Sequence, residues 1–124
     1  KNAIEEPCDR LKSPAQMEVV GKHIVKYSDL DALGHTNNAK YAEWTTDCIA
    51  PEIFRNYRVK EFQINFNAET KLGEHIEIWS KEIETPENIR STNALGDDSR
   101  TFCFEGKRDG KSVYEAIFTF IPYL

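Results

Sequence analysis

The side chains best suited to chemistry are concentrated in ten residues near the start of the sequence, DLDALGHTNN at positions 29–38. This segment holds two carboxylates, Asp29 and Asp31, with the imidazole of His35 and two asparagine amides. A helix expected directly after it would point free N–H groups and the positive end of its dipole toward a carbonyl oxygen that turns anionic. Gly34 permits close backbone approach or a positive φ. The segment therefore favours acyl chemistry, in which a carboxylate acts on water or on the carbonyl and His35 hydrogen-bonds or shuttles a proton.

A purely structural interpretation fits the same residues. Asp31 would start an Asx turn, Asn37 would cap the following helix, and His35 would be a surface loop residue. Composition alone does not separate this interpretation from the catalytic one.

The elements that must position this segment lie on either side of it. The run EVVGKHIVKY at 18–27 is rich in β-branched residues and predicts a first strand that ends near residue 27. A helix is predicted from a cap at Thr36 or Asn37 to residue 50, because one stripe of it carries apolar side chains at Tyr41, Trp44, Cys48 and Ile49. Pro51 should stop or kink the helix, and EIFRN at 52–56 should form a second short turn.

The rest of the chain is predicted to be strand. The segment 62–69 alternates, with Phe62, Ile64 and Phe66 on one face and polar residues on the other. Further strands are predicted at 74–84, 89–95, 100–108 and 111–121. Asp109 and Gly110 separate the last two and are typical of a type I′ hairpin turn. A strand, one central helix and then antiparallel strands indicate an α+β domain.

One helix cannot cover both faces of such a sheet. Apolar side chains fall on both faces of the last strand, with Tyr114 and Phe118 on one and Val113 and Ile117 on the other. We therefore expect the second face to pack against a partner, either another copy of the chain or a sister domain.

Composition excludes several classes of protein. The 124 residues form one domain, and no window approaches the roughly 20 apolar residues of a membrane span. The net charge of −5 has the wrong sign for general nucleic-acid binding. Three cysteines without CxxC spacing make a disulfide framework unexpected and favour a reducing compartment. We expect no metal site and no cofactor, and we predict a cytoplasmic location.

The segment YSDLDALGHTNNAKYAEW at 27–44 resembles the signature of the hotdog-fold thioesterases, and the resemblance extends over residues 18 to 122. It implies a curved antiparallel β-sheet wrapped around one central α-helix. FNAET at 66–70 resembles the corresponding segment of one branch, the acyl-acyl-carrier-protein thioesterases, because Glu69 falls on that branch's glutamate. Members of this branch carry two hotdogs on one chain, with the catalytic residues in the C-terminal half. The resemblance thus implies a hotdog thioesterase domain at 18–124. Residues 1–17, which contain two prolines and mixed charges without an apolar period, are predicted to be an N-terminal arm or inter-domain linker.

The resemblance also assigns roles to residues. Asp31 matches the catalytic aspartate, His35 the catalytic histidine, and Glu69 the glutamate that helps to bind or activate water. The substrate-binding residues that we expect are Gly34, Asn37, Asn38 and Tyr41. Two positions depart from the family: Leu33 replaces an asparagine and Thr70 a cysteine, so Thr70 excludes a cysteine nucleophile there. We expect direct hydrolysis, with Asp31 as base or nucleophile and the helix N–H groups at the oxyanion.

Three functions remain open at this point. The first is hydrolysis of fatty acyl thioesters on acyl carrier protein to free fatty acid, ending fatty-acid synthesis, with a second hotdog as sister domain or homodimer mate. The second is a stand-alone acyl-CoA thioesterase of the 4-hydroxybenzoyl-CoA thioesterase-like type, which DALGH supports and Glu69 opposes. The third is a hotdog that binds acyl thioesters without cleaving them, for which Leu33 is the supporting feature.

Overall fold

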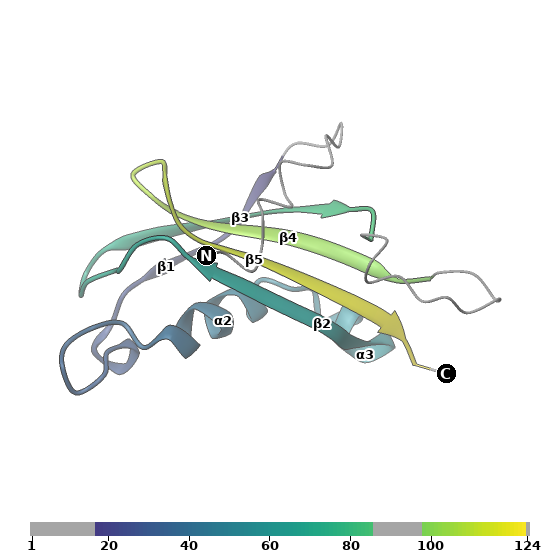
Figure 1. Ribbon diagram of the computed structural model, residues 1–124, viewed down its shortest axis with the longest axis horizontal. Coiled ribbons are helices and arrows are strands. Elements are labelled where there is room, and N and C mark those ends of the chain that lie inside the picture. The colour runs from purple at the N-terminus through teal and green to yellow at the C-terminus, as the bar shows by residue number, and fades with distance from the viewer. Residues whose placement is uncertain (1–16, 86–97, 124) are drawn as a thin grey trace.

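Five strands form one antiparallel sheet in the computed structural model, which describes residues 17–85 and 98–123 (Figure 1). Their order across the sheet is β1-β3-β4-β5-β2, so that β1 and β2 are its two edges. The strands are β1 (Glu18–Ile24), β2 (Tyr57–Phe66), β3 (His75–Ile83), β4 (Arg100–Arg108) and β5 (Lys111–Pro122). The predicted α+β class with a single antiparallel sheet is confirmed.

The helical elements are η1 (Tyr27–Asp29), α2 (Asn38–Thr46) and α3 (Pro51–Asn56). The longest, α2, ends at Thr46, four residues before the predicted end. The hydroxyls of Thr45 and Thr46 donate to the carbonyls of Tyr41 and Ala42 at 2.8 Å each, and this back-bonding by β-branched residues weakens a helix. The second short turn is confirmed as α3, which has Pro51 at its first position.

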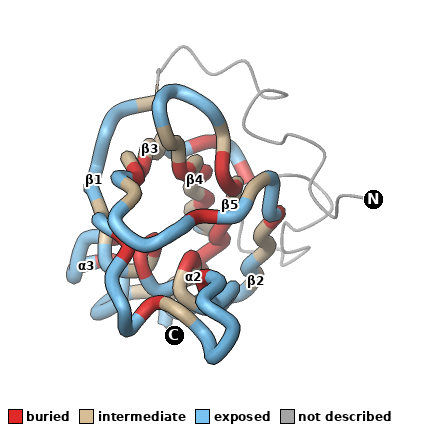
Figure 2. The backbone as a smooth tube through the Cα atoms, turned by 90° about the vertical axis from the view of Figure 1, so that its left-hand side faces the viewer, coloured by how far each residue is buried: buried red, intermediate tan, exposed pale blue. Residues whose placement is uncertain are grey.

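The main core lies between the sheet and the helices. Both α2 and α3 lie on the same side of the sheet (Figure 1), and the buried positions gather in the central strands and on the inner side of α2 (Figure 2). The buried apolar residues of this core are Val25, Tyr41, Trp44, Ile49, Ile53, Ile76, Ile78, Phe104, Val113, Tyr114, Ala116, Phe118 and Phe120. Three of the five strands, β3, β4 and β5, and both α-helices contribute, so this core fixes the start of α2 relative to the sheet.

The hairpin between β4 and β5 has the predicted turn. Asp109 and Gly110 both have positive φ, 54° and 79°, as a type I′ turn requires. The two strands are paired from Arg100↔Phe120 to Arg108↔Lys111.

Three observations differ from the sequence predictions. Phe62 and Phe66 keep 37% and 42% of their surface exposed, because β2 is an edge strand of the described sheet. Val113 and Ile117 are buried within the chain, so the second face of β5 is not left open there. Cys103 is disulfide-bonded, contrary to the prediction from cysteine spacing.

Two predictions fall outside the part of the chain that the structure describes. They are the strand at 89–95 and, apart from Met17, the N-terminal arm. Within the described residues, none of the helices has the length and apolar character needed to cross a membrane.

Candidate active site

The loop before α2 is folded back on itself by its own backbone. Leu30 and Thr36 form an isolated antiparallel bridge, the N–H of Asp31 donates to the carbonyl of His35 at 2.7 Å, and the N–H of Gly34 donates to the carbonyl of Asp31 at 3.0 Å. Gly34 has a φ of 81°, a conformation that side chains with a Cβ rarely adopt. The loop therefore presents Asp31 and His35 side by side.

The carboxylate of Asp31 is held by one of its two oxygens. Oδ1 accepts the backbone N–H groups of Leu33 at 2.9 Å and His35 at 3.1 Å, the Asx turn that the sequence predicted. Within residues 17–85 and 98–123, Oδ2 has no hydrogen-bond partner, and the residue is exposed. The structural and the catalytic interpretations are thus compatible, because each uses a different oxygen.

Glu69 joins this pair from the segment after β2. Its Oε2 lies 3.2 Å from Nδ1 of His35, and the two side chains are 65% and 56% exposed. A carboxylate at Nδ1 favours the tautomer with a proton there and leaves Nε2 as the basic nitrogen. The structure thus brings together the three residues predicted to be catalytic, separated in sequence by up to 38 positions.

A buried hydroxyl network holds the Glu69 segment against the catalytic loop. The hydroxyl of Thr36 donates to the carbonyl of Thr70 at 2.8 Å and lies 2.7 Å from the hydroxyl of Thr70. The hydroxyl of Tyr41 completes the network at 3.0 Å from Thr70. From the other side, Nη1 of Arg108 donates to the carbonyl of Glu69 at 2.7 Å. Thr70, which replaces a cysteine, acts here as a fully buried anchor.

The start of α2 leaves one backbone donor open. The side-chain oxygen of Asn37 accepts the N–H of Ala39 at 3.0 Å, which confirms Asn37 as the cap. The N–H of Lys40 donates to the carbonyl of Asn37 at 2.8 Å. Among the described residues the N–H of Asn38 has no acceptor, so it is the first-turn donor available to an oxyanion.

Asp29 lies beneath the loop and differs sharply from Asp31. It is 4% exposed and accepts from Nε2 of His23 at 2.7 Å, the N–H of Lys26 at 2.8 Å and Nε1 of Trp44 at 3.3 Å. Burial by itself would raise the pKa of Asp29, but these donors outweigh it and hold the pKa below its ordinary value. Its carbonyl accepts the N–H of Asn37 at 2.8 Å, so Asp29 ties β1 to the start of α2.

Other predicted residues occupy contrasting positions. Tyr41 is buried, with its ring against Trp44, Phe66 and Tyr114, so it shapes the site from beneath. Leu33, by contrast, is 80% exposed at the loop tip.

Sequence reasoning did not predict the positioning roles of Thr36, Thr70, Arg108 and His23. The one signal available was the polar character of Thr70 at a family cysteine position. In the described part of the chain, no group of three or more His, Cys, Asp or Glu residues could hold a metal ion.

Comparison with protein families gives one match. The sequence profile of the acyl-ACP thioesterase C-terminal domain matches residues 12–117, which include all three candidate catalytic residues. No curated protein sequence matches the chain significantly.

Solved structures show the same fold. An acyl-ACP thioesterase from Bacteroides thetaiotaomicron is 24% identical, with a TM-score of 0.66 over 90% of this chain and 43% of its own. The 12:0-ACP thioesterase from Umbellularia californica is 17% identical, with a TM-score of 0.71 over 90% and 38%. A Thermus thermophilus thioesterase complexed with coenzyme A and Zn is 17% identical, with a TM-score of 0.71 over 88% and 86%. The chain thus spans less than half of the two acyl-ACP thioesterases, and its hotdog fold is confirmed.

Proposed function

Because the chain belongs to the acyl-ACP thioesterase C-terminal domain family, we propose that it hydrolyses fatty acyl thioesters on acyl carrier protein and releases free fatty acid. The observation that carries this proposal is the meeting of Asp31, His35 and Glu69 at the start of α2. Acyl transfer to water requires groups that move protons and a donor that stabilises the oxyanion. Here two carboxylates and one imidazole lie near the backbone N–H of Asn38, which is that donor.

The chemistry follows from the open atoms of the site. Oδ2 of Asp31 positions or deprotonates a water that attacks the thioester carbonyl, or attacks the carbonyl itself to form an anhydride that water then hydrolyses. The carbonyl oxygen becomes negative and is stabilised by the N–H of Asn38. The proton that the water loses passes to the basic Nε2 of His35, which supplies it to the thiolate when the carbon–sulfur bond breaks, and Glu69 orients the His35 ring. The products are a carboxylic acid and the free thiol of the carrier.

The carrier protein is the proposed partner in preference to coenzyme A. Besides the family match, two lysines in the segments that build the site, Lys26 and Lys71, are exposed, and Lys40 is half-buried. Such cations attract an acidic carrier protein and raise its association rate.

An exposed edge strand, β2, supports the further proposal that a second hotdog lies beside this one.

The test is the substitution Asp31→Asn, assayed with one medium-to-long acyl chain presented on carrier protein and on coenzyme A. Asparagine keeps an Oδ1 that can accept the N–H groups of Leu33 and His35, so the loop should persist while Oδ2 is lost. We expect kcat to fall by roughly 10²–10⁴-fold, with the melting temperature unchanged, and wild-type kcat/KM to be higher for the carrier protein.

Each alternative function gives a different result in this assay. Higher kcat/KM with coenzyme A would favour the acyl-CoA thioesterase. Saturable binding of the acyl thioester with no turnover by the wild type would favour a binding-only hotdog. Full activity of the Asp31→Asn variant would contradict the proposed mechanism.

A further inference from the structure

The segment at 67–74, which carries the third candidate catalytic residue, is bound at both ends by the β4–β5 hairpin. It connects β2 to β3 without helix or strand structure. At its start, the N–H groups of Asn67 and Ala68 donate to the carbonyl of Val113, at 2.7 and 3.0 Å. The side chain of Asn67 also donates to the hydroxyl of Ser112 at 2.9 Å. These contacts hold the start of the segment against β5.

Arg108, the last residue of β4, binds the middle and the end of the same segment. A single nitrogen, Nη1, donates to the backbone carbonyl of Glu69 at 2.7 Å and to Oε1 of Glu74 at 2.9 Å. The same Oε1 accepts the N–H of Lys71 at 2.8 Å. The guanidinium therefore connects the backbone at Glu69 with the turn that leads into β3.

The ion pair of Arg108 and Glu74 is partly shielded from water, since the two side chains are 29% and 31% exposed. Burial by itself would raise the pKa of Glu74, but the N–H of Lys71 and the guanidinium of Arg108 outweigh it and hold the pKa below its ordinary value. Hydrogen bonds between charged groups are about twice as strong as neutral ones. Glu74 thus fixes Arg108 where it can bind the carbonyl of Glu69.

The position of the Glu69 backbone matters because its side chain reaches the ring of His35. Oε2 of Glu69 lies 3.2 Å from Nδ1, and both side chains are mostly exposed. An exposed pair loses side-chain entropy when it is held in one geometry, so the contact depends on how well the backbone is anchored. Thr36 and Thr70 anchor the segment on the side of the catalytic loop, and Arg108 anchors it on the side of the hairpin.

We propose that Arg108 is a positioning residue for thioester hydrolysis. Through the backbone of Glu69 it holds that carboxylate at Nδ1 of His35, and so keeps the proton of the neutral imidazole on Nδ1. The inference rests on the proposed function for the task of His35, because Nε2 must be the basic nitrogen that passes a proton to the thiolate. The place of the ring proton, however, is a property of the protein with or without turnover.

The test is ¹⁵N NMR of the protein labelled in its histidines, at about pH 9, where imidazoles are neutral. The chemical shifts of the two ring nitrogens report which of them carries the proton. His35→Gln identifies the signals of His35 among those of the three histidines. We expect the Nδ1–H form of His35 to predominate in the wild type and to give way to a mixture of both forms in the Arg108→Met variant.

Two milder variants separate positioning from general damage to the fold. Because one nitrogen of Arg108 makes both contacts, the ammonium group of Arg108→Lys should restore most of the Nδ1–H form. Glu74→Gln keeps an acceptor for the N–H of Lys71 but removes the charge that fixes Arg108. It should change the tautomers in the same direction as Arg108→Met and by less. Melting temperatures of all variants set the assay temperature well below unfolding.

Turnover gives a second measurement. Arg108→Met should lower kcat by about 10-fold to 10²-fold and change KM by less than about twofold, because proton transfer is impaired and not binding. In a Glu69→Gln background the same substitution should change kcat by less than about twofold, since both residues act through one carboxylate.

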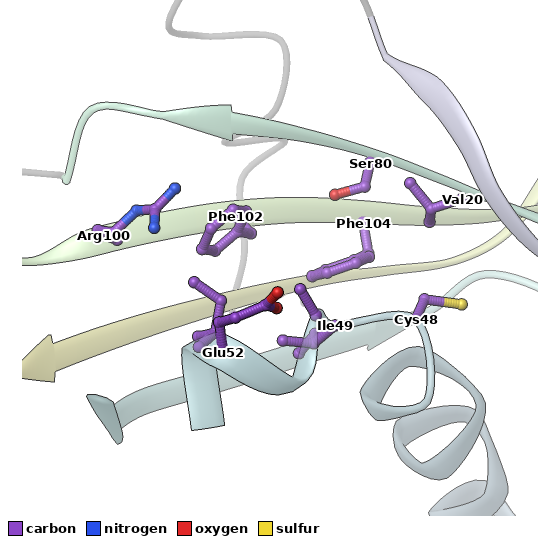
Figure 3. Close-up of a pocket in the computed structure, with 10 residues that line it drawn as sticks. Val20, Cys48, Ile49, Glu52, Ser80, Arg100, Phe102 and Phe104 are labelled. Carbon is purple, nitrogen blue, oxygen red and sulfur yellow. The ribbon is translucent and has the colours of Figure 1, made fainter. Parts of the chain in front are cut away.

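Arg100→Met is the matched control. Arg100 also lies on β4 and donates to a glutamate, Glu82, at 2.8 and 2.9 Å. These side chains are 38% and 44% exposed, close to the values for the Arg108 pair. Figure 3 shows Arg100 at the start of β4, on the wall of a cavity, with Phe102 and Phe104 following along the strand. Its removal breaks an ion pair at the opposite end of β4, so the tautomers of His35 and kcat should not change.

The results separate this inference from the proposed function. A changed tautomer in Arg108→Met, in a protein that hydrolyses no thioester, would support the positioning of His35 and contradict the proposed function. Unchanged tautomers in Arg108→Met, or an equal change in Arg100→Met, would overturn the positioning role whatever the effect on kcat. An equal fall in kcat with and without the Glu69 carboxylate would also overturn it.

Discussion

Two aspartates only two positions apart carry out opposite tasks in the same loop. Asp29 is buried and uses both carboxylate oxygens on three donors, whereas Asp31 is exposed and keeps one oxygen open. Residue type alone does not distinguish them. What separates them is that β1 and Trp44 supply donors to Asp29, while Asp31 lies beyond the reach of both.

At the residue scale, Glu69→Gln tests the orientation of His35. A glutamine that turns its amide N–H₂ toward Nδ1 favours the other tautomer, so we expect kcat to fall by about 10²-fold. Because the Glu69 side chain is mostly exposed, the melting temperature should not change. Glu43→Gln is the matched control, since Glu43 is equally exposed and paired with Lys40. Equal activity of the Glu69→Gln and Glu43→Gln variants would remove Glu69 from the mechanism.

Asp29→Asn tests the buried carboxylate through the pH dependence of stability. The folded-state pKa of Asp29 is lowered, so its contribution is complete above the unfolded pKa of about 3.9 and is lost as pH falls through the folded value. We expect the free energy of unfolding of the variant to be about 1–3 kcal/mol lower than that of the wild type at pH 7. The difference should be smaller in acid. Urea unfolding at pH 7 and pH 3 measures both. A loss that grows in acid would contradict the assignment, and Asp31→Asn should change stability by less than about 0.5 kcal/mol.

At the element scale, β4 and β5 depend on one close approach. Any Cβ at Gly106 would overlap the ring of Tyr114, whose hydroxyl lies 2.6 Å from that of Thr45 in α2. We expect Gly106→Ala to destabilise the fold by about 1–3 kcal/mol in urea unfolding. In a Tyr114→Leu background the same change should cost less, because the overlapping ring is absent. An equal cost in both backgrounds would assign the effect to the strand backbone.

The sequence predicted those elements whose structure is determined by residues next to one another in the chain. The cap at Asn37, the turn at Asp109-Gly110 and the second helix at Pro51 each depend on a few adjacent residues. The anchoring of Glu69 was not predictable in this way. It depends on Thr36 meeting Thr70, 34 positions away, and only strand pairing brings them together. The resemblance gave Asp31, His35 and Glu69 as candidate catalytic residues without showing what holds them in place.

At the scale of the whole molecule, the site lies near β2, an edge of the sheet that residues 17–85 and 98–123 form. Among the described strands β2 pairs with β5 alone, and its exposed apolar side chains are Val59, Phe62 and Phe66. The ring of Phe66 also contacts Tyr41, beneath the catalytic loop. An edge strand with exposed apolar groups is a template for pairing with another chain. A second hotdog at this edge would therefore adjoin the catalytic loop and bury both surfaces.

Val59→Lys tests this arrangement, because a lysine on an edge strand opposes pairing. Burial of one valine contributes about 1.5–3 kcal/mol, so we expect self-association in sedimentation velocity to weaken at least about tenfold. Val19→Lys is the matched control: Val19 is also 42% exposed but lies on β1, the opposite edge. If association through β2 completes the site, the Val59→Lys variant should lose turnover in proportion to its loss of dimer. The Val19→Lys variant should keep both. A wild-type chain that stays monomeric, or equal weakening by both lysines, would contradict pairing through β2.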